Sequence, residues 1–181
     1  WGYADYLKVM ELTEQMIAYV CDEVLGKRIV VYDGQELDFN PPWRRLELRQ
    51  GILDTVGIDI SLYSTGEALA EAMRAKGINV KPGSTRGKLI DALLGDFLEP
   101  TLIQPTFVTH LPRELCPLAK LNADDPGLID VFELCIGGME IAPAYSEQND
   151  PFVQREMFEK QVGEDQQKMD TDFLLALEHG M

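Results

Sequence analysis

Two glutamates, Glu133 and Glu140, have the residue type and spacing of a site for a divalent cation. The dipeptide Gly137-Gly138 predicts a two-residue β-hairpin turn, which pairs Cys135 with Glu140 and Glu133 with Ala142. Side chains alternate between the faces of a strand, so these four residues share one face, with the glutamates as diagonal neighbours about 7–8 Å apart at the backbone. Like charges so placed repel each other, and a hard divalent cation between them removes the repulsion.

The same hairpin admits a plainer interpretation, in which the two glutamates belong to an ordinary solvated face. The opposite face carries apolar side chains that we expect in the core: Phe132, Leu134, Ile136 and Ile141. A third carboxylate, Glu147, falls on that opposite face by strict alternation. It joins Glu133 and Glu140 only if a β-bulge or twist intervenes, and Pro143 is where we expect one.

Periodicity and capping residues predict the elements around this hairpin. Helices are expected at residues 4–25, 47–56, 65–76 and 86–98, after Asp150, and around 172–177, with a polar linker at 163–169. Strands are expected at 43–48, 103–109 and 113–119, and Asp33-Gly34 predicts a hairpin turn within 28–39. The apolar stripe of the first helix is interrupted at Thr13 and Glu14. Ser64 to Glu67 has the spacing of a capping box, and Gly77 that of a helix-ending glycine.

Composition limits the classes of function. The chain has 181 residues, enough for one domain or one and a half, and its 45% hydrophobic content is typical of a globular protein. Its net charge of −15 predicts that this acidic segment alone is unlikely to bind nucleic acid. Residues 81–88, KPGSTRGK, suggest a phosphate-binding loop, but they lack its glycine–lysine spacing. No membrane-length apolar run or signal pattern is present, so we expect no membrane partner and a cytoplasmic location.

Cysteines and histidines offer little chemistry by their spacing. Cys21, Cys116 and Cys135 are far apart and odd in number, which argues against structural zinc and against a disulfide framework. His110 and His179 are isolated in the sequence. The chain starts and stops within a few residues of predicted helices, so we expect it to be a segment of a longer protein.

Five segments resemble the class II lysyl-tRNA synthetase family in sequence, order and spacing. They are PPWRRL (41–46), IQPTFVTHLPRELCPLAK (103–120), DDPGL (124–128), FELCIGGMEIAPAYSEQNDP (132–151) and DFLLALEHGM (172–181). The resemblance covers nearly the whole chain. Its most specific part is the FEL, GG, EI, AYSE and NDP series, which favours the lysine enzyme over its aspartate and asparagine relatives.

The resemblance implies a fold class and a division of the chain. The expected fold is α+β, part of a class II synthetase antiparallel sheet flanked by helices, with a small helical insertion. Residues 1–46 (a helix plus a hairpin) and 101–181 (the acidic hairpin and helices) then belong to the catalytic domain. Residues 47–100 form the helical insertion, and the whole segment falls between class motifs 2 and 3.

The resemblance also implies roles for four residues. In the family the two glutamates hold Mg²⁺ and help to position ATP, which assigns Glu133 and Glu140 here. An aromatic ring lies along the lysine side chain and a buried carboxylate meets its ammonium group, which assigns Tyr145 and Glu147. The implied reaction is ATP-dependent activation of lysine, then transfer to tRNA(Lys). Mg²⁺ is thus the implied cofactor and ATP the co-substrate, and the parent enzyme is expected to be a homodimer.

The chain departs from the family pattern in four places. Pro143 replaces an asparagine, Met139 an arginine, Cys116 a serine, and Leu121-Asn122 a basic pair. Pro143 cannot make the side-chain contact with lysine that the asparagine makes. The arginines of motifs 2 and 3, the dimer motif and the anticodon-binding domain are not among these 181 residues. We therefore expect the isolated chain to be unable to form an adenylate.

Two functions remain open at this stage. The chain is either a segment of a charging enzyme, or a non-charging, synthetase-like binding or regulatory module. Pro143 and the missing motifs favour the second function, whereas the intact set Glu133, Glu140, Tyr145 and Glu147 favours the first. A third possibility, an acidic structural domain without a ligand, leaves the matching site residues as coincidence.

Overall fold

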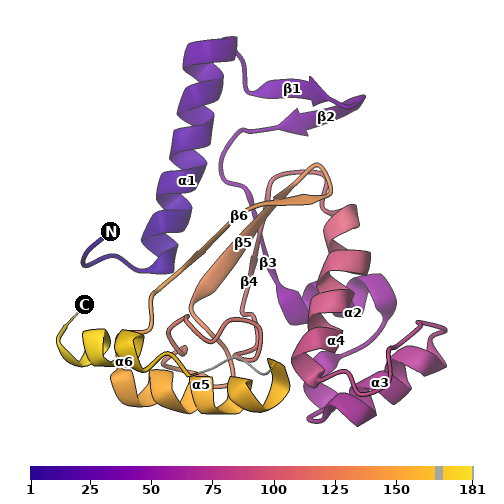
Figure 1. The fold of residues 1–181 in the computed structure, drawn as a ribbon. Helices are drawn as coiled ribbons and strands as arrows, with labels where there is room; N and C mark the ends of the chain where they lie inside the picture. Colours follow the sequence, from indigo (N-terminus) through magenta and orange to yellow (C-terminus); the bar gives the residue numbers. More distant parts are fainter. Residues whose placement is uncertain (166–168, 181) are drawn as a thin grey trace.

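A computed structural model describes residues 1–165 and 169–180 of the chain (Figure 1). Its helices are α1 (Tyr6–Val20), α2 (Leu48–Val56), α3 (Gly66–Ala75), α4 (Arg86–Leu93), α5 (Pro151–Asp165) and α6 (Thr171–Glu178). Its strands are β1 (Ile29–Tyr32), β2 (Gln35–Asp38), β3 (Arg44–Glu47), β4 (Thr106–Thr109), β5 (Val131–Ile136) and β6 (Met139–Tyr145). Short π-helical turns extend α1 (Cys21–Leu25) and α4 (Leu94–Leu98). The predicted α+β class is confirmed.

The main sheet has the strand order β3-β4-β5-β6 and is mixed. Strands β4, β5 and β6 are antiparallel neighbours, but β3 and β4 run parallel, with Arg44 opposite Thr106. The prediction of an antiparallel sheet is therefore wrong for β3 and β4. A parallel pair needs a long crossover, and residues 48–105, which contain α2, α3 and α4, provide it.

The two faces of this sheet bury different partners. On one face, α1 and the separate β1–β2 hairpin cover an aromatic-rich cluster: Met10, Leu37, Trp43, Phe107, Phe132, Leu134 and Ile136. On the other face, α2, α3 and α4 pack on a larger aliphatic cluster that includes Leu46, Val108, Val131 and Cys135 from the strands. Figure 1 shows α1 and the three insertion helices on opposite sides of the sheet. Helices α2, α3 and α4 thus share their core with the face that carries Glu133.

Glu14 explains the interruption in the apolar stripe of α1. Its side chain is only 7% exposed, and its Oε1 accepts a hydrogen bond of 2.7 Å from the backbone N–H of Trp43. The Trp43 ring stacks on Phe107 with 5.6 Å between ring centroids. A polar residue in the buried stripe therefore joins α1 to the start of β3, since it satisfies a donor that burial would leave unpaired.

Several local predictions are confirmed. Asp33 and Gly34 have φ of 49° and 76°, as a type I′ turn between β1 and β2 requires. Asp150 caps α5, with its Oδ1 accepting from the N–H of Phe152 at 2.8 Å, and Pro151 is the first helical residue. Gly77 follows α3 with φ of 79°. No helix among the described residues is long and apolar enough to cross a membrane.

Other local predictions are wrong or shifted. Thr65, not Ser64, caps α3, because its hydroxyl accepts from the N–H of Ala68. Residues 113–119 form turns and one isolated bridge, at Ala119, instead of a strand. Pro117 lies in this stretch and Pro112 directly precedes it, and neither offers a backbone donor to a strand ladder. The expected linker at 163–169 begins inside α5, which extends to Asp165. Its residues 166–168 lie outside the described part of the chain.

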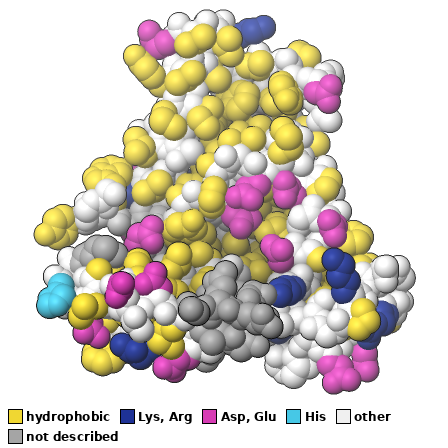
Figure 2. Space-filling model, in the orientation of Figure 1, with side chains coloured by type: hydrophobic (Ala, Val, Ile, Leu, Met, Phe, Trp, Pro, Cys, Tyr) yellow, Lys and Arg dark blue, Asp and Glu magenta, His cyan; other side chains and the backbone are white. Residues whose placement is uncertain are grey.

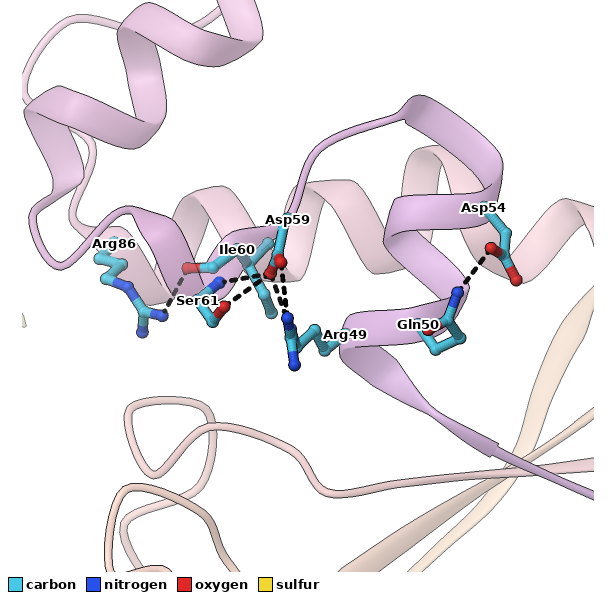
Figure 3. Close-up of polar contacts among 7 residues, drawn as sticks. All are labelled: Arg49, Gln50, Asp54, Asp59, Ile60, Ser61 and Arg86. Atoms are coloured by element: carbon cyan, nitrogen blue, oxygen red, sulfur yellow. Dashed lines mark hydrogen bonds and ion pairs between the residues drawn. The ribbon is translucent and has the colours of Figure 1, made fainter.

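A polar network fixes the first turns of the insertion (Figure 3). Arg49 on α2 forms two hydrogen bonds to the carboxylate of Asp59, at 2.7 and 2.6 Å. Asp59 also accepts from the hydroxyl of Ser61 at 2.7 Å, and Arg86 donates to the carbonyl oxygen of Ile60 at 3.2 Å. The hydrogen bonds from Arg49, followed by those from Ser61, hold the pKa of Asp59 well below its usual range.

Candidate functional site

The acidic hairpin forms around the predicted turn. Gly137 and Gly138 have φ of 64° and 77°, and Cys135 pairs with Glu140 as predicted. Beyond that pair the register shifts by one residue, so that Leu134 faces Ala142 and Glu133 faces Pro143. The predicted pairing of Glu133 with Ala142 is therefore wrong.

The cause of the shift is a β-bulge at Ile141, two residues before the position expected for it. Ile141 has no partner in the register and is 50% exposed, so its predicted place in the core is also wrong. The other three residues assigned to that face, Phe132, Leu134 and Ile136, are buried as predicted.

The bulge determines which residues share the face of Glu133. Before it, the even-numbered Glu140 lies on this face, and after it the odd-numbered Pro143 and Tyr145 do. Val131, opposite Tyr145, belongs to the same aliphatic cluster that Tyr145 contacts. An extra residue in β6 therefore brings Tyr145 to the side of the sheet that carries both glutamates.

Glu147 lies just beyond β6, where a second segment pairs with the chain. Ala119 bridges to Glu147, the N–H of Lys120 donates to the carbonyl oxygen of Ser146 at 2.8 Å, and that of Gln148 donates to Leu118 at 2.9 Å. The Cys116 thiol lies close enough to Glu147 and Glu133 for both charges to act on it. Glu147 is exposed, whereas the expected ammonium-binding carboxylate is buried.

Electrostatics distinguish Glu133 from its neighbours. Burial, followed by the charges of Glu140, Asp91 and Glu99, raises the pKa of Glu133 to about 7 from an ordinary value of 4.5. Burial together with Glu99, Glu133 and Glu140 raises the pKa of Cys135 to about 12. Neutral Glu133 is thus favoured at low pH, and a bound cation would favour its ionised form.

Glu99 is a residue of this site that the sequence did not reveal. It lies in the 3₁₀ turn Glu99–Thr101 at the end of the insertion, and its Oε1 accepts from the N–H of Glu140 at 2.6 Å. The adjacent hairpin turn donates from Gly137 to Ile103 at 2.8 Å and from Gly138 to Leu102 at 3.1 Å. Glu99 is 41 residues from Glu140 in the sequence, and no local pattern signals the contact.

The two carboxylates of the site fit a cation that completes its coordination shell with water or substrate atoms. Glu133 and Glu140 provide two carboxylates on one face, and among the described residues no three Asp, Glu, His or Cys side chains converge as metal ligands. Mg²⁺ is commonly held by one or two carboxylates and completes its octahedral shell with water and substrate phosphates. Two carboxylates in a field of like charge therefore match Mg²⁺ bound with a nucleotide better than a closed structural metal site.

Sequence comparison agrees with this geometry. An α+β fold with helices on both faces of the main sheet agrees with what the resemblance to class II aminoacyl-tRNA synthetases implies. The sequence profile described as "tRNA synthetases class II (D, K and N)" matches residues 1–181, so the chain belongs to this family.

Curated relatives are similar along the whole chain. A lysine–tRNA ligase of Dehalococcoides mccartyi (strain ATCC BAA-2266 / KCTC 15142 / 195) is 44% identical over 187 residues, which cover 99% of this chain and 38% of that protein. A lysine–tRNA ligase of Synechococcus sp. (strain CC9605) is 43% identical, with 99% and 37% covered. One of Moorella thermoacetica is 43% identical, with 99% and 38% covered. The chain spans little more than a third of the length of these relatives.

Proposed function

We propose that the chain is a segment of a lysine–tRNA ligase and carries its lysine-binding residues and its Mg²⁺ ligands. The observation that carries this proposal is the bulge at Ile141, which gives Glu133, Glu140 and Tyr145 a common face. The relatives at 43–44% identity are lysine–tRNA ligases, which supports lysine as the substrate. On this proposal the whole protein works in the cytoplasm as a homodimer that charges tRNA(Lys).

The residues divide the work of binding. The ring of Tyr145 lies along the aliphatic stem of the lysine substrate, and the carboxylate of Glu147 accepts hydrogen bonds from its ammonium group. Glu133 and Glu140 hold the Mg²⁺ that accompanies ATP. Selection by a carboxylate at the end of a long apolar stem discriminates against substrates that lack the terminal charge.

The proposed reaction needs no side-chain nucleophile. A carboxylate oxygen of lysine bonds to the α-phosphorus of ATP and pyrophosphate leaves, which gives lysyl-adenylate. A hydroxyl of the terminal ribose of tRNA then bonds to the activated carbonyl carbon, and AMP leaves. Mg²⁺ neutralises phosphate charge when it is bound, and Glu133 and Glu140 keep it in place. The isolated chain is expected to bind lysine without forming adenylate.

Calorimetric titration with lysine tests the proposal, in the presence and absence of ATP and Mg²⁺. Glu147→Gln is expected to abolish lysine binding, whereas Glu159→Gln, an exposed control on α5, is expected to leave it unchanged. Equal lysine affinity of the two variants would contradict the role of Glu147. No heat from lysine with the unmodified chain would contradict a binding site within this segment.

The alternative is a synthetase-like module that does not charge tRNA, and Pro143 is the observation that favours it. Pro143 faces Glu133 in the register and offers no side-chain polar group to a ligand. Pro143→Asn supplies an amide at this place, and on the ligase proposal it tightens lysine binding. Lysine-dependent pyrophosphate exchange by the longer protein would exclude the non-charging alternative.

A further inference from the structure

The positive charge of this acidic chain is concentrated in one segment of the insertion. Residues 72–90 contain five of the 16 basic residues and none of the 31 acidic residues. The segment runs from the second half of α3 to the middle of α4 and includes the KPGSTRGK loop. Figure 2 shows Lys and Arg side chains on the lobe formed by α2, α3 and α4. The average charge of −15 therefore hides a local region of the opposite sign.

The segment borders a cleft of about 650 Å³, which we name the basic cleft. Its lining includes Gly66, Glu67, Arg74, Lys81, Ser84 and Arg86. A Cβ atom at Gly66 would lie 2.9 Å from the carbonyl oxygen of Ser84, so the backbones of α3 and the loop approach each other closely where both line the cleft. Three cations and one carboxylate thus line this cleft, together with the closely spaced backbones of Gly66 and Ser84.

Two of these cations are available to a ligand. Arg86 is committed, because it pairs with Glu114 and donates to the carbonyl oxygen of Tyr63 at 2.8 Å. Arg74 and Lys81 are exposed, and neither has an ion-pair partner within residues 1–165 and 169–180.

A neighbouring cleft provides a contrast. It has a volume of about 500 Å³ and meets the basic cleft at Arg86, and Arg49 and Arg113 also line it. These two arginines are already neutralised, by Asp59 and by Glu156. Of these two clefts, the basic cleft is the one whose lining includes cations without an ion-pair partner among the described residues.

We propose that the basic cleft binds backbone phosphates of RNA, through Arg74 and Lys81. Cations that face open space and have no protein partner match a phosphate chain, whose charges repeat along its length. The acidic surface elsewhere repels the same chain and so restricts contact to this lobe. The identity of the RNA as tRNA rests on the proposed ligase function, whereas the contact with phosphates rests on the charges alone.

The test uses a fluorescently labelled 12-base-pair RNA duplex and measures its anisotropy with the 181-residue chain, from 25 to 150 mM salt. The double variant Arg74→Gln with Lys81→Gln removes two contacts, so affinity at 100 mM salt falls roughly 50-fold and the salt slope falls by about 2. The matched control removes two exposed lysines near α1, Lys8→Gln with Lys27→Gln, and keeps the affinity and slope of the unmodified chain.

Each outcome bears on the proposal. No binding of the duplex at 25 mM salt, or equal losses in the two double variants, overturns it. Inorganic tripolyphosphate serves as a competitor at equal phosphate concentration. Competition as strong as that of unlabelled duplex overturns the assignment to RNA in favour of a free phosphate chain. Titration of the unmodified chain with lysine separates the two proposals. Absence of lysine binding would contradict the proposed ligase function, but it would not contradict RNA binding at the basic cleft.

Discussion

Glu133→Gln is expected to change how the stability of the chain depends on pH, because burial and neighbouring charges raise the pKa of Glu133. The folded chain holds the Glu133 proton up to about pH 7, whereas the unfolded chain releases it near 4.5. This contribution to stability is complete below pH 4.5 and is lost as the pH rises through 7. The pKa difference corresponds to about 3 kcal/mol of unfolding free energy. Glutamine does not titrate. The unfolding free energy of the variant, relative to that of the unmodified chain, is therefore expected to rise by about 3 kcal/mol between pH 4 and pH 8.

Urea unfolding at pH 4, 5, 6, 7 and 8 measures this change, with fluorescence of the buried Trp43 as the probe. Glu23→Gln, an exposed control on the turn after α1, is expected to show no such gain. At pH 8, Mg²⁺ is expected to stabilise the unmodified chain and not Glu133→Gln, because a cation bound to Glu133 and Glu140 offsets the repulsion between their charges. A difference in unfolding free energy between Glu133→Gln and the unmodified chain that stays constant from pH 4 to 8 would refute the reasoning.

Three further substitutions test contacts that position the site. Glu14→Leu leaves the buried N–H of Trp43 unpaired and is expected to cost about 1–3 kcal/mol in urea unfolding, while Glu14→Gln keeps an acceptor and costs less. Asp150→Ala removes the cap of α5 and is expected to cost about 1 kcal/mol, and Asp150→Asn is expected to restore most of it. Glu99→Gln keeps the hydrogen bond to β6 but removes a charge, so carbon NMR of the carboxyl is expected to show a lower pKa for Glu133. An unchanged Glu133 pKa in this variant would exclude Glu99 from the field of the site.

Local chemistry in the sequence was enough to predict much of the hairpin. The Gly137-Gly138 pair predicted the turn, and both glycines have the positive φ that such a turn requires. The two-residue alternation predicted that Phe132, Leu134 and Ile136 are buried, as they are. The bulge could not be placed in the same way, because Ile141 is β-branched and favours a regular strand. Its position depends on packing across the sheet, which one sequence does not record.

Contacts between segments far apart in the chain were the second feature that could not be predicted from the sequence. The parallel pair of β3 and β4 joins segments separated by the whole crossover, and Glu99, near the end of that crossover, contacts Glu140 in β6. Glu14 gave a signal, as a charge in an apolar stripe, but its partner Trp43 follows a proline pair and a separate hairpin. Such contacts depend on topology and therefore exceed what periodicity and spacing can predict.

The bulge at Ile141 makes the length of β6 as important as its composition. Deletion of this one residue would remove the bulge and keep the present pairs, so Glu133, Glu140 and Tyr145 would still share a face. Insertion of one residue between Ala142 and Pro143 would act differently. Every residue after the insertion would change sides, so Tyr145 would turn toward the aromatic cluster beneath α1 while the two glutamates stay together. A single-codon insertion could thus separate cation binding from amino-acid binding.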